Sequence, residues 1–197
     1  MNIDAQTIQS LRSQTGAGIV DCKNALAETN GDIAKAAEIL RKKGIAKAAS
    51  KGERVTKEGR VASYVHSNNK VGVLVEIQCE TDFVARTEAF QNFVNDVAMQ
   101  IAAMNPLYVS REQVPAEVVE KEKEIAMAEF ADSPKPKDVI EKIASGKIEK
   151  FFGEVCLVDQ KFIKDEDVTI GELLKQTIAK TGENMRIVRF ARFAMGE

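Results

Sequence analysis

The stretch QCETDFVAR, residues 78–86, joins two hydrophobic patterns of different period. Before it, every second residue is apolar, which predicts a strand with one buried face made of Val71, Val73, Val75, Ile77 and Cys79. After it, the apolar residues follow helical spacing and comprise Phe90, Phe93, Val94, Val97, Ile101 and Met104. We therefore expect a rigidly held loop between a strand and a helix.

The polar and aromatic residues of this loop allow two interpretations. Thr81 and Asp82 are residue types that cap helices, so Asp82 can cap the next helix while Phe83 packs beneath it. An acidic side chain beside a large aromatic one, on a connection between stable elements, is also a way to contact a partner. Local chemistry favours the capping interpretation, and composition does not decide between the two.

Length and charge limit the kinds of partner. The 197 residues are enough for one or two domains. The 28 Lys and Arg residues nearly balance the 30 Asp and Glu residues, and the formal charge of -2 creates no field that attracts nucleic acid or anionic lipid. The start, Met1-Asn2-Ile3-Asp4, has no signal-peptide character, and no run approaches the roughly 18 to 20 apolar residues that span a bilayer. We expect a cytoplasmic protein that contacts neither nucleic acid directly nor a membrane.

The cysteine and histidine residues form no recognisable catalytic or metal-binding motif. Cys22, Cys79 and Cys156 lie too far apart in sequence for a short-spacing metal motif, and we expect them to be buried thiols in a reducing cytosol. His66 is the only histidine, so a multi-histidine metal site is excluded. It is expected at a strand end beside a turn, exposed or half-buried, with contact to a partner as the second possibility. We expect no catalytic residue, no bound metal and no cofactor.

The amino-terminal part, residues 1–53, is expected to form a module of three short amphipathic helices. Asp4 and Asp32 are placed to cap the first and third helices, and the third is expected to end at Gly44. The inward faces of the three helices comprise Ile8 and Leu11, then Ile19, Cys22 and Leu26, then Ile33, Ala36, Ala37 and Leu40. The segment 47–59 mixes basic residues with alanine, glutamate and glycine, so it is expected to be a solvated, partly helical linker.

The remaining residues, 54–197, are expected to form an α+β domain with a small antiparallel sheet packed with helices. An alternating segment around Val61–Val65 and the strand from Val71 form a hairpin through the turn at 67–70, and the segment 185–194 supplies a third strand. The elements expected between them are a helix over about 87–104, a helix opening near Pro115, a turn at 132–136, a short helix ending near Gly146, an extended segment at 154–158, and a helix from the capping box at 169–172 to Gly182.

Two separated motifs closely resemble bacterial elongation factor Ts. They are TDFVAR at 81–86 and TGAGIVDCKNAL at 15–26. The likeness continues through SPKP at 133–136, GEV at 153–155 and GENMRI at 182–187, so it covers essentially the whole chain. The resemblance is to the short form of the family, and it implies that the helical module has a ubiquitin-associated-like fold.

The resemblance also implies a function. Members of this family release GDP from elongation factor Tu, and the TDFV residues, here Thr81, Asp82, Phe83 and Val84, are associated with displacing the magnesium ion that helps to hold the nucleotide. Such a guanine nucleotide exchange factor binds a protein and performs no covalent chemistry, so it is not an enzyme in the usual sense. Further contacts with the partner are expected at Arg12, Lys23 and His66. Longer members of the family carry two related sheet subdomains, whereas this chain has room for one, so the resemblance implies a homodimer in a two-plus-two complex.

Two other classes of function remain open from the sequence. A hydrolase using Cys79 with His66 needs a thiol of lowered pKa with a base in reach, whereas Cys79 is in phase with the apolar strand face. A ubiquitin-associated-like adaptor without exchange activity would depend on the first module alone. An assay of GDP release from elongation factor Tu distinguishes the classes, because only an exchange factor is expected to accelerate the release.

Overall fold

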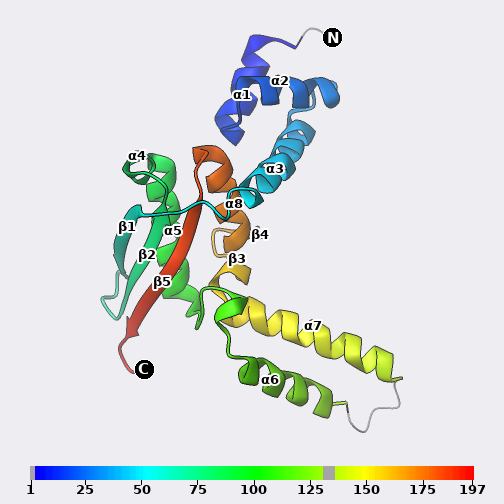
Figure 1. Cartoon of the computed structure of the whole chain (residues 1–197), viewed down its shortest axis with the longest axis vertical. Helices are drawn as coiled ribbons and strands as arrows, with labels where there is room; N and C mark the ends of the chain where they lie inside the picture. Colours follow the sequence, from blue (N-terminus) through cyan, green and yellow to red (C-terminus); the bar gives the residue numbers. More distant parts are fainter. Residues whose placement is uncertain (1–2, 131–135) are drawn as a thin grey trace. The chain divides into compact units, whose positions relative to one another are not determined.

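The computed structural model describes residues 3–130 and 136–197 (Figure 1). It consists of helices and small sheets, so the predicted α+β class is confirmed. The helices are α1 (Ala5–Thr15), α2 (Ile19–Glu28), α3 (Ile33–Ala49), α4 (Asp82–Ala85), α5 (Glu88–Met104), α6 (Ala116–Ala128), α7 (Lys137–Val155) and α8 (Ile170–Thr181). The strands are β1 (Glu58–Val65), β2 (Val71–Cys79), β3 (Lys161–Phe162), β4 (Asp165–Thr169) and β5 (Met185–Ala194). The turn predicted at 132–136 lies outside the described residues, apart from Pro136.

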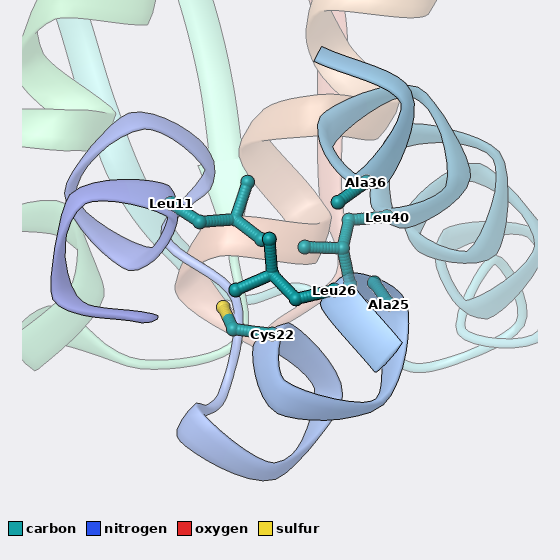
Figure 2. Packing of buried hydrophobic residues seen from close by; sticks show 6 residues of the cluster. All are labelled: Leu11, Cys22, Ala25, Leu26, Ala36 and Leu40. Atoms are coloured by element: carbon teal, nitrogen blue, oxygen red, sulfur yellow. The ribbon is translucent and has the colours of Figure 1, made fainter. Parts of the chain in front are cut away.

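Helices α1, α2 and α3 enclose a core of their own, as predicted. Figure 2 shows the buried side chains of this cluster, which are Leu11, Cys22, Ala25, Leu26, Ala36 and Leu40. Ile3 and Ile8, which lie on either side of the Asp4 cap, both pack against the cluster. The prediction that Ile19 faces inward was wrong, because its side chain is 55% exposed and Ala25 is buried instead.

Caps define the ends of these helices as the sequence indicated. The Asp4 carboxylate accepts a hydrogen bond from the Thr7 backbone N–H at 2.6 Å, and the Asp32 carboxylate accepts one from the Lys35 N–H at 3.1 Å. Gly16 ends α1 in the left-handed conformation, with φ of 68°. These hydrogen bonds are local in sequence, which is why they could be predicted.

The main sheet has three strands in the order β1-β2-β5. The His66 N–H donates to the Val71 carbonyl across the predicted hairpin. The Met195 N–H donates to the Lys70 carbonyl, so the end of β5 lies beside the start of β2 and these two strands are antiparallel. The predicted third strand is confirmed, and so is the buried face of β2 for Val73, Val75, Ile77 and Cys79, whereas Val71 is only half-buried.

Two buried glutamines organise the residues around the small sheet of β3 and β4. The Gln100 amide of α5 donates to the Gln160 side chain at 3.2 Å and to the Lys161 carbonyl at 2.9 Å, and its oxygen accepts from the Ile163 N–H at 3.0 Å. The Gln160 amide donates in turn to the Glu154 carbonyl at 2.8 Å. Both residues are fully buried, so these hydrogen bonds offset the loss of water around their amides. The β3–β4 pair was not predicted from the sequence.

Two predicted helix ends were wrong, because glycine does not by itself end a helix. Helix α3 continues through Gly44 to Ala49, and a Cβ atom added at Gly44 would lie 3.0 Å from the Ala179 Cβ of α8. The glycine therefore serves the close approach of two helices. Helix α7 continues through Gly146 to Val155, where strand-like residues were expected from 154. A single internal glycine costs only about 1 kcal/mol, and α7 packs along its neighbour α6 (Figure 1).

The chain forms two compact units that are each built from several segments. The first comprises Met1–Val61, Glu76–Asn95 and Glu172–Ile187, and the second comprises Ala62–Val75, Asp96–Gly171 and Val188–Glu197. The domain boundary predicted between residues 53 and 54 stays a prediction.

Gly59 provides a test of how closely β1 approaches β2. It has φ of 142°, and a Cβ atom there would lie 2.2 Å from the Ile77 carbonyl oxygen. We expect Gly59→Ala to lower the free energy of unfolding by roughly 2 to 4 kcal/mol, measured by urea denaturation, because it combines a clash with an unfavourable φ. Gly72→Ala is the matched control in β2, since no atom outside its chain neighbours lies within 4 Å of the added Cβ, and it should change stability by less than about 1 kcal/mol. Equal stability of the two variants would contradict the close approach.

Candidate functional site

The loop that leaves β2 is closed by a threonine cap. The Thr81 hydroxyl accepts a hydrogen bond from the Val84 N–H at 3.4 Å and begins the single turn of α4. The prediction that Asp82 caps this helix was wrong: Asp82 is the first residue of α4, and its carboxylate pairs with Arg86 at 2.8 Å. The helix predicted over about 87–104 is confirmed as α5, and α4 is a separate single turn before it.

Phe83 is exposed at this turn. Its side chain is 79% exposed, whereas those of Val84 and Ala85 are buried. The prediction that Phe83 packs beneath the helix was therefore wrong. With Thr81 as the cap, the two residues that follow Phe83 occupy the core-facing side of the turn, which leaves Phe83 on the other side. We refer to Thr81, Asp82, Phe83 and Val84 as the Phe83 loop.

A carboxylate from a distant part of the chain holds the base of the Phe83 loop. The Glu183 carboxylate accepts the Thr81 N–H at 3.0 Å and the Thr81 hydroxyl at 2.7 Å, one through each oxygen. The Thr81 carbonyl accepts from the Cys79 thiol at 3.1 Å. All the polar groups of Thr81 are therefore engaged. Sequence reasoning singled out Glu183 only as part of the GENMRI motif and assigned it no role.

The segment expected to be a solvated linker is hydrogen-bonded to the turn that follows α8. The Asn184 side-chain amide donates to the Gly52 carbonyl at 3.2 Å and to the Arg54 carbonyl at 2.7 Å. The Lys51 ammonium donates to the Gly182 carbonyl at 2.6 Å. Thr56 is buried and its hydroxyl donates to Gln78 at 3.2 Å. The linker is therefore held along its length, which its composition did not indicate.

The other predicted contact residues are all at the surface. Arg12 lies in the last turn of α1 and Lys23 in α2, and both are exposed. His66 follows β1 and is exposed, with its Nδ1 atom 3.0 Å from the Tyr64 hydroxyl. Arg12 and Lys23 belong to the same compact unit as the Phe83 loop, whereas His66 belongs to the other.

Neither cysteine chemistry nor metal binding is supported by the described part of the chain. Burial, and then the charge of Glu183, raise the pKa of the Cys79 thiol from 9.0 to about 11, so the thiol stays protonated near neutral pH. Cys79 is the last residue of β2, whereas His66 pairs with the first. Within residues 3–130 and 136–197, no three His, Cys, Asp or Glu side chains gather closely enough to hold a metal ion.

Known proteins resemble this chain over nearly its whole length. The family model described as Elongation factor TS matches residues 20–197. The chain belongs to the elongation factor Ts family. A protein named Elongation factor Ts from Fervidobacterium nodosum is 58% identical over 197 residues, which is all of both chains. The Elongation factor Ts of Thermosipho melanesiensis is 57% identical over 99% of this chain and 100% of its own length. That of Geobacter sulfurreducens is 54% identical over 100% of this chain and 91% of its own length.

The family match confirms the resemblance carried by TDFVAR and TGAGIVDCKNAL, and it identifies a translation elongation factor. The roles of Thr81, Asp82, Phe83 and Val84, and of Arg12, Lys23 and His66, stay predictions. No helix in the described ranges is both long and apolar enough to cross a membrane.

The thiol of Cys79 gives a test against a nucleophilic role. Because its pKa is about 11 in the folded protein and 9.0 is its ordinary value, we expect alkylation by iodoacetamide at pH 8 to be about a hundredfold slower in the native protein than in guanidinium. The native rate should rise as the pH approaches 11. The measurement is mass spectrometry of the Cys79 peptide, with the unfolded protein as control, and rapid native labelling at pH 8 would revive the hydrolase interpretation.

Proposed function

We propose that this elongation factor binds GDP-loaded elongation factor Tu and promotes GDP release by displacing the bound magnesium ion, after which GTP rebinds. The observation that carries the proposal is the exposure of Phe83 on a turn whose base is fixed by hydrogen bonds. A large apolar side chain held in water has no role in the factor's own core. It is suited to enter a pocket or cleft of a partner, where its burial stabilises the complex.

The free energy for GDP release comes from binding and requires no covalent step. If the factor binds nucleotide-free elongation factor Tu more tightly than the GDP-bound form, linkage requires that it weaken GDP binding by the same factor. Phe83 inserts into the GTPase domain of the partner, and Asp82, paired with Arg86, helps to fix the loop. Magnesium then loses its coordination and GDP leaves. The factor itself needs no cofactor and is not an enzyme in the covalent sense.

The helical module supplies a second contact with the same GTPase domain. Arg12 and Lys23 are exposed on helices whose apolar faces are committed to the module's own core, so their charged ends are free to meet a partner surface. His66, exposed after β1, is assigned to a further contact. We assign the factor to the cytoplasm, where translation takes place. Its near-neutral charge of -2 gives no reason for a direct contact with nucleic acid.

We also propose a homodimer that forms a two-plus-two complex with elongation factor Tu. The register of the three strands follows from the His66–Val71 and Met195–Lys70 hydrogen bonds. In this register Val65, Leu74 and Phe193 lie on one face of the sheet, and all three are exposed. Apolar side chains grouped on one sheet face favour a two-fold contact between sheets. Ala191 is on the same face and no cysteine lies in β5, so a disulfide in that strand plays no part.

Phe83→Ala separates a partner-contact role from a role in folding. We expect the melting temperature to stay nearly unchanged, because the side chain is exposed, while GDP release from elongation factor Tu falls at least about 25-fold, the effect of losing about 2 kcal/mol at an interface. The measurement is release of labelled GDP, with and without excess magnesium, beside thermal unfolding.

Leu107→Ala is the matched control, since Leu107 is also well exposed, at 63%, and has no assigned contact. A large fall in melting temperature with normal exchange by Phe83→Ala would refute the insertion of Phe83. Tight binding of elongation factor Tu by the wild-type factor without any release of GDP would favour the adaptor instead.

Phe193→Asp tests the dimer. Phe193 is 72% exposed in the single chain, and a buried carboxylate at a two-fold sheet contact is strongly unfavourable. We expect the wild-type factor to have the mass of a dimer by light scattering at tens of micromolar and the Phe193→Asp variant the mass of a monomer. Leu107→Asp, the same change at another exposed apolar residue, should remain a dimer. A wild-type monomer at that concentration with full exchange activity would eliminate the dimer.

A further inference from the structure

The turn that presents Phe83 is too short to hold itself in place. Helix α4 has four residues, and a single helical turn fixes several backbone angles for very few hydrogen bonds. Val84 and Ala85 anchor one side of the turn in the core. The orientation of the other side, which carries Phe83, depends on the cap at Thr81.

The Thr81 cap depends in turn on Glu183. A threonine hydroxyl can rotate, and it caps a helix only when its lone pair faces the N–H group of the first turn. By accepting the hydroxyl proton at 2.7 Å, the Glu183 Oε1 atom fixes this rotation and directs a lone pair to the Val84 N–H. The Oε2 atom accepts the Thr81 N–H at 3.0 Å, so the backbone is held as well. The Asp82 carboxylate does not hold Thr81, because it pairs with Arg86.

Glu183 is itself held in place from two directions. Gly182 ends α8 with φ of 82°, and its N–H donates to the Ile178 carbonyl. On the other side, the Asn184 N–H donates to Glu80 at 2.6 Å, and the buried Asn184 amide donates to the Gly52 and Arg54 carbonyls. The Glu183 carboxylate thus extends from a rigid turn between α8 and β5.

We infer that Glu183 is a positioning residue for nucleotide exchange: it fixes the Thr81 cap and thereby the direction in which Phe83 is presented to the partner. The inference rests on the proposed function. Glu183 touches neither the nucleotide nor magnesium, and its effect is transmitted through Phe83. The polar contacts of Thr81 thus link the turn after α8 with the Phe83 loop.

Glu183→Gln is the primary test. Glutamine has the same shape, but it offers one acceptor oxygen and an NH2 group that faces the second Thr81 donor. We expect the rate of labelled GDP release from elongation factor Tu at saturating factor to fall about tenfold, the effect of losing hydrogen bonds to a charged acceptor. Glu149→Gln is the matched control, because Glu149 also accepts two hydrogen bonds, from Arg111, and has no assigned contact with the partner. It should release GDP at the wild-type rate.

A double-mutant cycle distinguishes positioning from general stability. If Glu183 acts through Phe83, Glu183→Gln should lower exchange by less than about twofold when Phe83 is already alanine. A further tenfold loss in that background would overturn the inference. So would a wild-type rate of release for Glu183→Gln alone.

Thr81→Val keeps the test informative if Glu183→Gln does not fold. Valine has the shape of threonine without the hydroxyl that donates to Glu183, so Thr81→Val should slow exchange about tenfold, as Glu183→Gln is expected to do. Exchange by Thr81→Val at the wild-type rate would overturn the inference.

The proposed function and the inference fail in different ways. If the wild-type factor does not accelerate GDP release, the proposed function is wrong. If the wild-type factor does so and Phe83→Ala loses the activity, but Glu183→Gln keeps it, then only the positioning role of Glu183 is wrong.

Discussion

The buried face of β2 is the constraint on which the other features depend. Val73, Val75, Ile77 and Cys79 are buried in alternation, so a slip of one residue would exclude all four from the core and bring Leu74, Glu76 and Gln78 into it. The register of β2 is therefore fixed by apolar burial. Because the strand cannot slip, the point at which the chain leaves it, just before Thr81, is fixed too.

At the end of β2, polar contacts act together with apolar burial to fix the chain. The carboxylate of Glu183 engages Thr81, and the amide of Asn184 engages the carbonyls of Gly52 and Arg54. Hydrogen bonds are directional, so they specify one conformation where few apolar side chains are available to pack. The buried pair Gln100 and Gln160 does the same around β3 and β4.

Stability and partner contact are carried by neighbouring residues of one turn. Val84 and Ala85 are buried and anchor it, while Phe83 is exposed and Asp82 is half-buried. Phe83 adds little to the core, so the free energy gained by burying its ring becomes available when a complex forms. The same division recurs in the helical module, where Leu11 and Cys22 form the core and their neighbours Arg12 and Lys23 lie at the surface.

The sequence by itself determined the features that depend on near neighbours. The alternation of β2, the caps at Asp4 and Asp32 and the β1–β2 turn all follow from residues a few positions apart, and so does the family, through its short motifs. Local reasoning failed where distant residues decide. Gly44 serves the close approach of α8 and not a helix end, and the Thr81 hydroxyl that caps α4 is held by Glu183, 102 residues away. The exposure of Phe83 follows from that cap, so only the tertiary structure could show it.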